Sequence, residues 1–286
     1  MYHGFAKFIR GKVFSLLFTV LSVLSMVYLS VKIGDFANYI WKINIYLVVF
    51  LLFAGMFTYM FLFFKSSKKV KKTRKCYEFC GCIACFFLNL LLFSLAYDIV
   101  FCFLSNKSEL WYLIPIGSAL CLCIYGYIHA KRLYVKRYSV SLEQGGHPIN
   151  MVLLSDIHTG TFVNRKQLHK IVDRVNSLDP DIVVITGDTF DVGAFEISDL
   201  PVIAEELQRI HTKEGAYAIL GNHDPSSQQQ EIVQFFKKTG IRLLIDEVIE
   251  KTDFYLVGRD DMITNPERKK LSILLEGCEN KPVILL

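Results

Sequence analysis

The stretch that decides the fold is residues 149–158, INMVLLSDIH, in which a short apolar run ends in serine, aspartate and histidine. A continuous apolar run of this length is typical of a buried β-strand. Two later stretches repeat the arrangement, residues 181–191 (DIVVITGDTFD) and residues 216–224 (AYAILGNHD). Each is an apolar run followed directly by glycine, aspartate, asparagine or histidine. The repetition predicts three buried strands with polar side chains at their carboxyl ends.

Helical patterns alternate with these runs. Residues 165–178, for example, place Leu168, Ile171, Val172 and Val175 at helical spacing. Further helices are predicted at 198–210 and 228–239. Strands are predicted at 149–154, 181–186, 216–220, 242–245, 254–257 and 282–286. Alternation of strands and helices indicates an α/β domain with a sheet covered by helices.

The polar residues that follow the three strands have the chemistry of metal ligands. They are Asp156, His158, Asp188, Asn222 and His223. In open α/β sheets, ligands bind at the carboxyl ends of strands, so these side chains are expected to meet at one edge. Any one of them alone would be explained as a turn or loop residue. Together they favour a pair of divalent metals, because a carboxylate can bridge two cations while imidazole and amide groups fill other positions.

The first half of the chain has a different composition. The whole chain has 52% hydrophobic residues and a net charge of +5, but the charge is split between a strongly basic first half and an acidic second half. Four stretches contain no Asp, Glu, Lys or Arg: 13–31, 43–64, 79–97 and 110–128. Each has the roughly 20 residues that a helix needs to cross a bilayer. We therefore expect a transmembrane domain at 1–138, a hinge at 139–148 and an α/β domain at 149–286.

The distribution of Lys and Arg predicts the orientation. Fourteen basic residues lie before the first span, between the second and third, and after the fourth, against three in the other loops. By the positive-inside rule both ends, and the α/β domain, are cytoplasmic. The Lys-rich loop at 65–75 could also bind anionic membrane lipids. Because the net positive charge belongs to the apolar half, a nucleic-acid binder whose basic face is the whole protein is excluded. A transporter is disfavoured because ion and substrate paths usually show ionisable residues inside the spans, and here the one candidate is Asp98, at the end of the third span.

The motifs resemble a known family. Asp156-x-His158, Gly187-Asp188-x-x-Asp191 and Gly221-Asn222-His223-Asp224 are similar, in order and spacing, to the first three motifs of the calcineurin-like metallophosphoesterases, and the membrane anchor is similar to the membrane-bound bacterial branch of that family.

The resemblance implies an α/β/β/α four-layer sandwich and a dinuclear metal-dependent hydrolase of phosphate esters or pyrophosphates that uses a metal-activated water. It implies manganese, iron or zinc as the two divalent ions, and a phosphate-containing substrate that a membrane anchor suggests is lipid-linked or nucleotide-linked. Residue by residue, it implies that Asp156 and His158 bind the first metal, Asp188 bridges and Asn222 binds the second. His223 would contact the phosphate or protonate the leaving group, and Asp191 and Asp224 would orient the ligands.

The chain departs from the family pattern in its histidines. The family has later histidines, one after a further strand and then a Gly-His-x-His pair, whereas all seven histidines here lie at or before position 223. We therefore expect the sandwich to be partial and the domain incomplete at its C-terminus. The alternative to an active phosphohydrolase is a catalytically inactive truncated phosphoesterase or a membrane scaffold.

Overall fold

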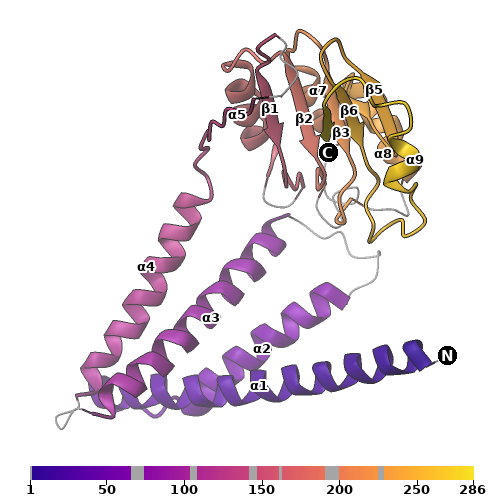
Figure 1. Ribbon diagram of the computed structural model, residues 1–286. Coiled ribbons are helices and arrows are strands. Elements are labelled where there is room, and N and C mark those ends of the chain that lie inside the picture. The colour runs from indigo at the N-terminus through magenta and orange to yellow at the C-terminus, as the bar shows by residue number, and fades with distance from the viewer. Residues whose placement is uncertain are drawn as a thin grey trace. The chain divides into compact units, whose positions relative to one another are not determined.

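The computed structural model describes residues 2–65, 74–103, 108–141, 147–160, 163–190, 200–224 and 229–286. The chain divides into two compact units, one built on the N-terminal helices and the other on residues 133–286 (Figure 1). The elements, in chain order, are α1 Tyr2–Trp41, α2 Tyr46–Lys65, α3 Arg74–Phe101, the 3₁₀ helix η1 Glu109–Tyr112, α4 Leu113–His129, β1 Met151–Leu154, α5 Arg165–Asn176, β2 Ile182–Thr186, α7 Leu200–Gln208, β3 Ala216–Ile219, α8 Gln229–Thr239, β4 Arg242–Leu243, β5 Glu247–Glu250, β6 Tyr255–Gly258, α9 Leu271–Leu274 and β7 Val283–Leu285.

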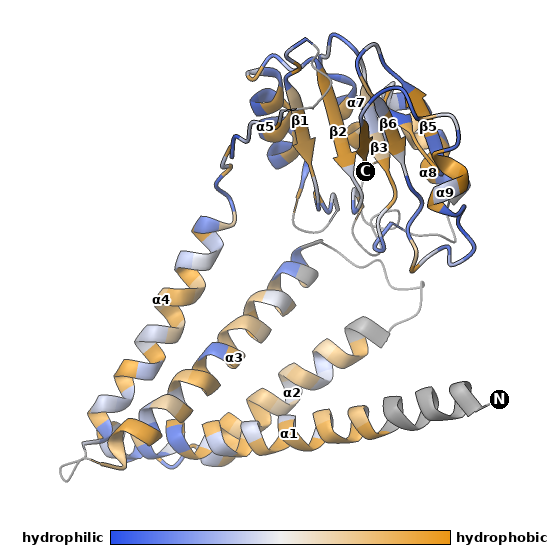
Figure 2. Cartoon of the chain, viewed as in Figure 1, coloured by the Kyte–Doolittle hydropathy of each residue, from blue (hydrophilic) through white to orange (hydrophobic). Residues whose placement is uncertain are grey.

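Apolar helices form the N-terminal unit, as the sequence predicts. Among the residues that the structure describes, three helices are long and apolar enough to cross a membrane, at Val13–Trp41, Glu78–Phe101 and Glu109–His129, and α2 supplies a shorter apolar helix at Tyr46–Leu62. Apolar residues predominate along the described parts of these helices (Figure 2), and many large apolar side chains of this unit are exposed. A helix that is apolar all round is suited to lipid, so the unit is membrane-associated.

One polar contact joins α1 to α3 within the apolar unit. Lys32 forms an ion pair with Asp98, and the hydroxyl of Tyr28 donates a hydrogen bond of 2.8 Å to the same carboxylate. Asp98, the ionisable residue that the sequence places at the end of the third span, therefore has two partners on α1. Ionisable groups at membrane depth usually pair in this way because an unpaired charge is costly there. The pairing accounts for Asp98 without a transport pathway.

Two sheets form the second unit. Strands β1, β2, β3 and β4 make a parallel sheet in that order, and β5, β6 and β7 make a smaller sheet in which β6 is antiparallel to β5 and parallel to β7. The alternating pattern of the sequence required crossover helices, and α5, α7 and α8 supply them. The predicted α/β domain with a helix-covered sheet is therefore confirmed.

The apolar side chains of these strands explain the packing. Alternate residues of β2 belong to different core clusters. Ile185 packs with residues of α5, α7 and α8, while Ile182 and Val184 pack with Leu256 of β6 and with Phe254, which directly precedes that strand. Strand β2 is buried on both faces, which is why its sequence is a continuous apolar run. The carboxyl ends of β1, β2 and β3 are thereby held at one edge of the parallel sheet.

Two short elements were not predicted. Strand β5, with the sequence EVIE, has a glutamate at each end and two apolar residues between them. It therefore shows neither a continuous apolar run nor the alternation of apolar and polar residues that is typical of a half-buried strand. Helix α9 is four residues long, which is too short to show a helical period. Both depend on tertiary packing, because Val248 of β5 and Leu274 of α9 belong to one small apolar cluster.

Candidate metal centre

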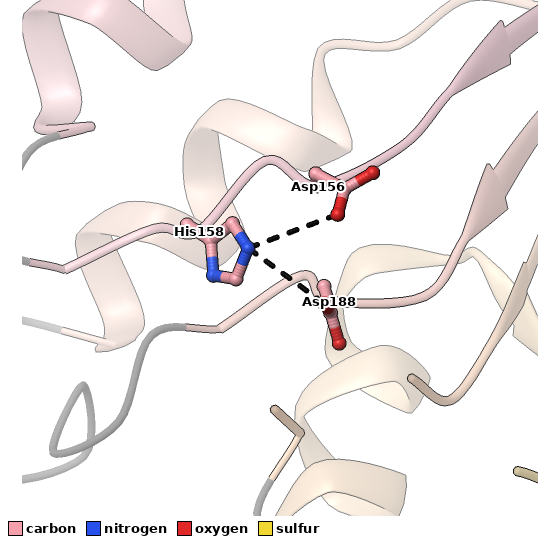
Figure 3. A group of neighbouring side chains, drawn as sticks. All are labelled: Asp156, His158 and Asp188. Atoms are coloured by element: carbon pink, nitrogen blue, oxygen red, sulfur yellow. Dashed lines mark ion pairs between the residues drawn. The ribbon is translucent and has the colours of Figure 1, made fainter. Parts of the chain in front are cut away.

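Asp156, His158 and Asp188 come together at the carboxyl edge of the parallel sheet (Figure 3). Asp156 and His158 lie in the turn after β1, and Asp188 lies in the turn after β2. One ligand atom from each lies within 4.8 Å of the others. The Nε2 atom of His158 lies 3.9 Å from an oxygen of Asp156 and 3.7 Å from an oxygen of Asp188. The sequence predicts that polar side chains meet at this edge of the sheet, and the structure brings these three together there.

The backbone of all three residues is left-handed. The φ angles are +53° at Asp156, +46° at His158 and +50° at Asp188. Non-glycine residues adopt this region at an energetic cost, although Asp and His tolerate it better than most. Strain of this kind clusters at functional sites because it aims side chains that a relaxed strand end would point elsewhere. Here it turns three side chains toward one point.

Two glycines allow the turns after β2 and β3 to approach closely. A Cβ atom on Gly187 would lie 2.8 Å from the Cα of Gly221, and Gly187 also has a φ of +83°. A Cβ on Gly221 would lie 2.2 Å from the Oδ1 atom of Asp188. These positions therefore require glycine, because any side chain would displace the other turn or the Asp188 carboxylate.

Asp188 is the most buried member of the group. It is 9% exposed, compared with the exposed Asp156 and the half-buried His158. Its Oδ1 atom accepts a hydrogen bond of 2.9 Å from the backbone N–H of His223, and its backbone carbonyl accepts one of 3.0 Å from the N–H of His158. One residue thus connects the turns after β1, β2 and β3. The Asp188 carboxylate is therefore fixed at the centre of the three turns.

The turn after β3 contributes the remaining predicted residues. Asn222 is exposed and lines the same cavity as Asp156 and Asp188. The ring of His223 lies edge-on to that of His158, with centroids 5.2 Å apart. Asp191, which the sequence also predicts at this site, lies outside the described residues.

Asp224 is buried behind the site. It is 3% exposed, and its two carboxylate oxygens accept hydrogen bonds from the backbone N–H groups of Phe190, at 3.0 Å, and Gly221, at 2.9 Å. Burial raises the pKa of this carboxyl group, the nearby Asp188 charge raises it further, and the two backbone hydrogen bonds oppose both. Asp224 therefore ties the turn after β2 to the turn after β3.

The second sheet supplies residues that sequence reasoning missed. A cavity of about 320 Å³ is lined by Asp156, Asp188 and Asn222 and also by Arg259 and Arg268. Arg259 is the first residue after β6, and Asp188 is likewise close behind its strand, as the second residue after β2. An apolar run ending in a charged residue is the signal that identified the other turns, and the segment YLVGRDD carries it as well.

The donor set suits hard or borderline divalent cations. Carboxylate oxygen and imidazole nitrogen are ligands for zinc, manganese and iron, and an amide oxygen such as that of Asn222 accompanies them in hard-cation sites. The ligand atoms of Asp156, His158 and Asp188 all lie within 4.8 Å of one another. Within the described part of the chain, Asp156, His158 and Asp188 are the group of metal-ligating side chains that lie close enough together to hold an ion. The residues present therefore fit a metal.

Comparison with known proteins agrees with this geometry. Residues 149–272 match the calcineurin-like phosphoesterase family. Over 183 residues the chain is 39% identical to a zebrafish (Danio rerio) protein described as a transmembrane protein with metallophosphoesterase domain, covering 58% of this chain and 41% of that protein. It is 32% identical over 147 residues to an uncharacterized metallophosphoesterase of Aquifex aeolicus, covering 50% of this chain and 55% of the relative.

A third relative has a named substrate. The chain is 33% identical over 78 residues to the UDP-2,3-diacylglucosamine pyrophosphatase of Chlamydia trachomatis, covering 27% of this chain and 23% of that enzyme. The chain thus spans about half of the length of the relatives it matches, or less.

Proposed function

Because the chain belongs to the calcineurin-like metallophosphoesterase superfamily, we propose that it is a membrane-anchored hydrolase of phosphate esters or phosphate anhydrides. The observation that carries the proposal is the convergence of Asp156, His158 and Asp188 within 4.8 Å at the edge of the sheet. A phosphate-containing substrate and a divalent cation both follow from the family. The group that is attached to the phosphate in the substrate, and the number of cations, are part of the proposal.

Each site residue has a proposed role. Asp156 and His158 would hold one cation, Asp188 would be shared by two and Asn222 would hold the second. When bound, two such cations activate a water molecule and stabilise the attacking and leaving oxygens of a phosphoryl transfer.

The remaining site residues act on the substrate or on the ligands. His223 contacts the phosphate or protonates the leaving group, in keeping with its exposed position beside His158. Asp224 keeps the turns after β2 and β3 in register through its two backbone hydrogen bonds. Asp191 would orient a neighbouring ligand.

The wider architecture is proposed on the same basis. Four spans would place both ends of the chain, and the α/β domain, at the cytoplasmic face, in accordance with the basic loops. The two sheets, with helices α5, α7 and α8 packed on one and α9 on the other, are consistent with a partial four-layer α/β/β/α sandwich. A substrate at the membrane surface, such as a lipid-linked diphosphate, suits an enzyme held there, and one relative is named for such a substrate.

Substitution of Asp188 tests the function. The full chain, purified in detergent and supplied with Mn²⁺, is expected to release p-nitrophenol from a generic phosphate ester, and Asp188→Asn is expected to abolish that release and lower the bound manganese. The matched control is Asp179→Asn. Asp179 also has a left-handed backbone, with a φ of +47°, but its side chain is 84% exposed and pairs with Lys213. Activity in Asp188→Asn equal to that of the control would reject the assignment.

The alternative, a phosphoesterase-like scaffold without activity, predicts a different outcome. The wild-type chain would then bind metal without turnover, or bind none. Manganese content and p-nitrophenol release, measured on the same preparations, separate an inactive metal-binding domain from an active one.

A further inference from the structure

The cavity at the metal centre has a second wall, which carries two arginines beside Asp260 and Asp261. Arg259 follows β6, and Arg268 lies in the loop between β6 and α9. Both line the cavity of about 320 Å³ that Asp156, Asp188 and Asn222 also line. Within the second unit, the cavity therefore joins the carboxyl ends of strands from both sheets.

Both guanidinium groups are anchored to backbone carbonyls. Arg259 donates from Nη2 to the carbonyl oxygen of Lys269 at 2.8 Å, and Arg268 donates from Nη1 to that of Asp260 at 2.7 Å. A carbonyl fixes the position of a guanidinium without neutralising its charge. Over the described ranges of the chain, neither arginine forms an ion pair with a carboxylate.

The neighbouring acids are occupied elsewhere. One Asp260 oxygen accepts from the side chain of Asn265 at 2.8 Å, and the other accepts from the N–H of Asp261 at 2.9 Å. The carboxylate of Asp261 accepts the N–H groups of residues 263 and 264, both within 2.9 Å. These acids shape the loop, and in the described structure neither of them forms an ion pair with Arg259 or Arg268.

Arg259 also has an unsatisfied donor. Its Nε atom is buried without a hydrogen-bond partner in the described structure. Buried donors without partners are rare and call for an explanation such as a missing ligand. Guanidinium groups match phosphate oxygens in geometry and charge.

We propose that Arg259 and Arg268 form a phosphate subsite beside the metal centre, so that the cavity recognises a substrate with two linked phosphoryl groups. One phosphoryl group lies at Asp156, Asp188 and Asn222, and the next lies against the arginine pair. Arg259 and Arg268 are thus specificity-determining residues that favour diphosphates over monophosphates. This inference rests on the proposed function, because it assumes that the metal centre receives the first phosphoryl group.

The test compares two probes that the protein cannot hydrolyse. Methylenediphosphonate, which has a carbon bridge between its phosphorus atoms, and inorganic phosphate are titrated calorimetrically into the full chain in detergent at a fixed free Mn²⁺ concentration. The wild type is expected to bind methylenediphosphonate at least about tenfold more tightly, the smaller end of the gain from charge-assisted hydrogen bonds. Arg259→Gln and Arg268→Gln are each expected to remove most of this preference and to change phosphate affinity by less than about threefold.

Two further variants separate binding from loop structure. Arg268→Lys keeps the charge but loses the planar fork, so it is expected to recover only part of the preference. Arg242→Gln is the matched control, because Arg242 pairs with Glu247 outside the cavity and its loss should leave both affinities unchanged. Amide exchange of residues 259–270 reports whether a variant has lost the loop.

The outcomes are distinguishable. Equal wild-type affinity for the two probes, or equal weakening of both in the arginine variants, overturns the subsite. If Asp188→Asn retains the wild-type manganese content, the proposed metal centre itself fails. If manganese responds to Asp188→Asn while the probes bind equally, only the diphosphate subsite fails.

Discussion

Gly221 lies directly against Asp188, and the space between them has no room for a methyl group. A Cβ on Gly221 would lie 2.2 Å from the Oδ1 atom of Asp188 and 2.5 Å from its backbone nitrogen. The same oxygen accepts the N–H of His223. The turn after β3 therefore holds the Asp188 carboxylate on two sides.

Gly221→Ala is expected to displace the Asp188 carboxylate and weaken metal binding without removing any ligand. The methyl group must push away both the carboxylate and the backbone nitrogen of Asp188, and the backbone nitrogen cannot move without shifting the turn after β2. We expect manganese affinity to fall at least about tenfold, since a change of 1.4 kcal/mol suffices. Equilibrium dialysis of the full chain measures it.

The control for this glycine is Gly117→Ala in α4. A Cβ at Gly117 meets no atom within 4 Å, so the same chemical change adds a methyl group in open space. Manganese affinity should match the wild type. An unchanged affinity in Gly221→Ala would show that the turn can relax around the methyl group.

Asp224→Asn is expected to loosen the turns that carry the site. One amide oxygen replaces two carboxylate oxygens, so either Phe190 or Gly221 loses an acceptor for its buried N–H group. Such a loss costs about 1–3 kcal/mol. Amide exchange of peptides covering 186–190 and 220–224 should become faster by roughly tenfold or more.

Asp253→Asn provides the comparison for Asp224. Asp253 also accepts a backbone N–H, from His147 at 3.1 Å, but it is remote in sequence from these turns and less buried. Its substitution should leave exchange of the two peptides unchanged. Protection equal to wild type in Asp224→Asn would mean that the hydrogen bonds to Phe190 and Gly221 do not stabilise the turns.

The centre of the site could be predicted from sequence because its parts are local. Strand β2 is buried on both faces, so its apolar run is continuous, and Asp188 follows it directly. The sequence pattern therefore contains both the strand and its end. The position of Arg268 could not be predicted in the same way. Arg268 lies ten residues beyond the end of β6, and it reaches the cavity only because Lys269 and Asp246 tie the intervening loop down.

The left-handed backbone of Asp156, His158 and Asp188 was also beyond sequence reasoning. A glycine in the sequence can indicate a positive φ, but an aspartate or a histidine does not. The sequence therefore gives no sign of the strained backbone at these three residues. Local propensity favours relaxed conformations at these residues, and the tertiary contacts of three turns override it.

Glu206 is expected to make the stability of the α/β domain depend on pH in the acid range. Burial alone would raise the pKa of this carboxyl group, but hydrogen bonds from Arg165, Arg209 and His169 outweigh it and lower the pKa to about 2. Its contribution is therefore fully present above the unfolded value of 4.5 and is lost as the pH falls from there toward 2. Exchange of the α5 and α7 peptides, corrected for the intrinsic effect of pH, should accelerate below pH 4.5.

Glu206→Gln removes this titration. The variant should be less stable at pH 7 by about 1–3 kcal/mol, because the side chains of Arg165, Arg209 and His169 lose a buried, charged acceptor, and its residual pH dependence below pH 4.5 should be flatter. Glu205→Gln is the neighbouring exposed control and should follow the wild type. A wild-type pH profile in Glu206→Gln would contradict the role of this carboxylate.

The contact between Lys32 and Asp98 is expected to stabilise the apolar unit as a pair. Lys32→Met leaves the carboxylate with Tyr28 alone, and Asp98→Asn leaves the ammonium without its ion-pair partner. The losses of stability in the two single variants should therefore add up to more than the loss in the double variant. The difference, the coupling energy, should be about 1 kcal/mol, which is typical of polar contacts between membrane helices.

Fluorescence reports on this unit selectively, because the two tryptophans, Trp41 and Trp111, both lie within it. Thermal unfolding in detergent, followed by tryptophan emission, gives the four stabilities of the cycle. Lys42→Met is a control, since the described contact of Lys42 is with the ring of Tyr39. Strictly additive effects of the Lys32 and Asp98 substitutions would show that the pair contributes no coupling, and α1 and α3 would then be held together by their apolar contacts alone.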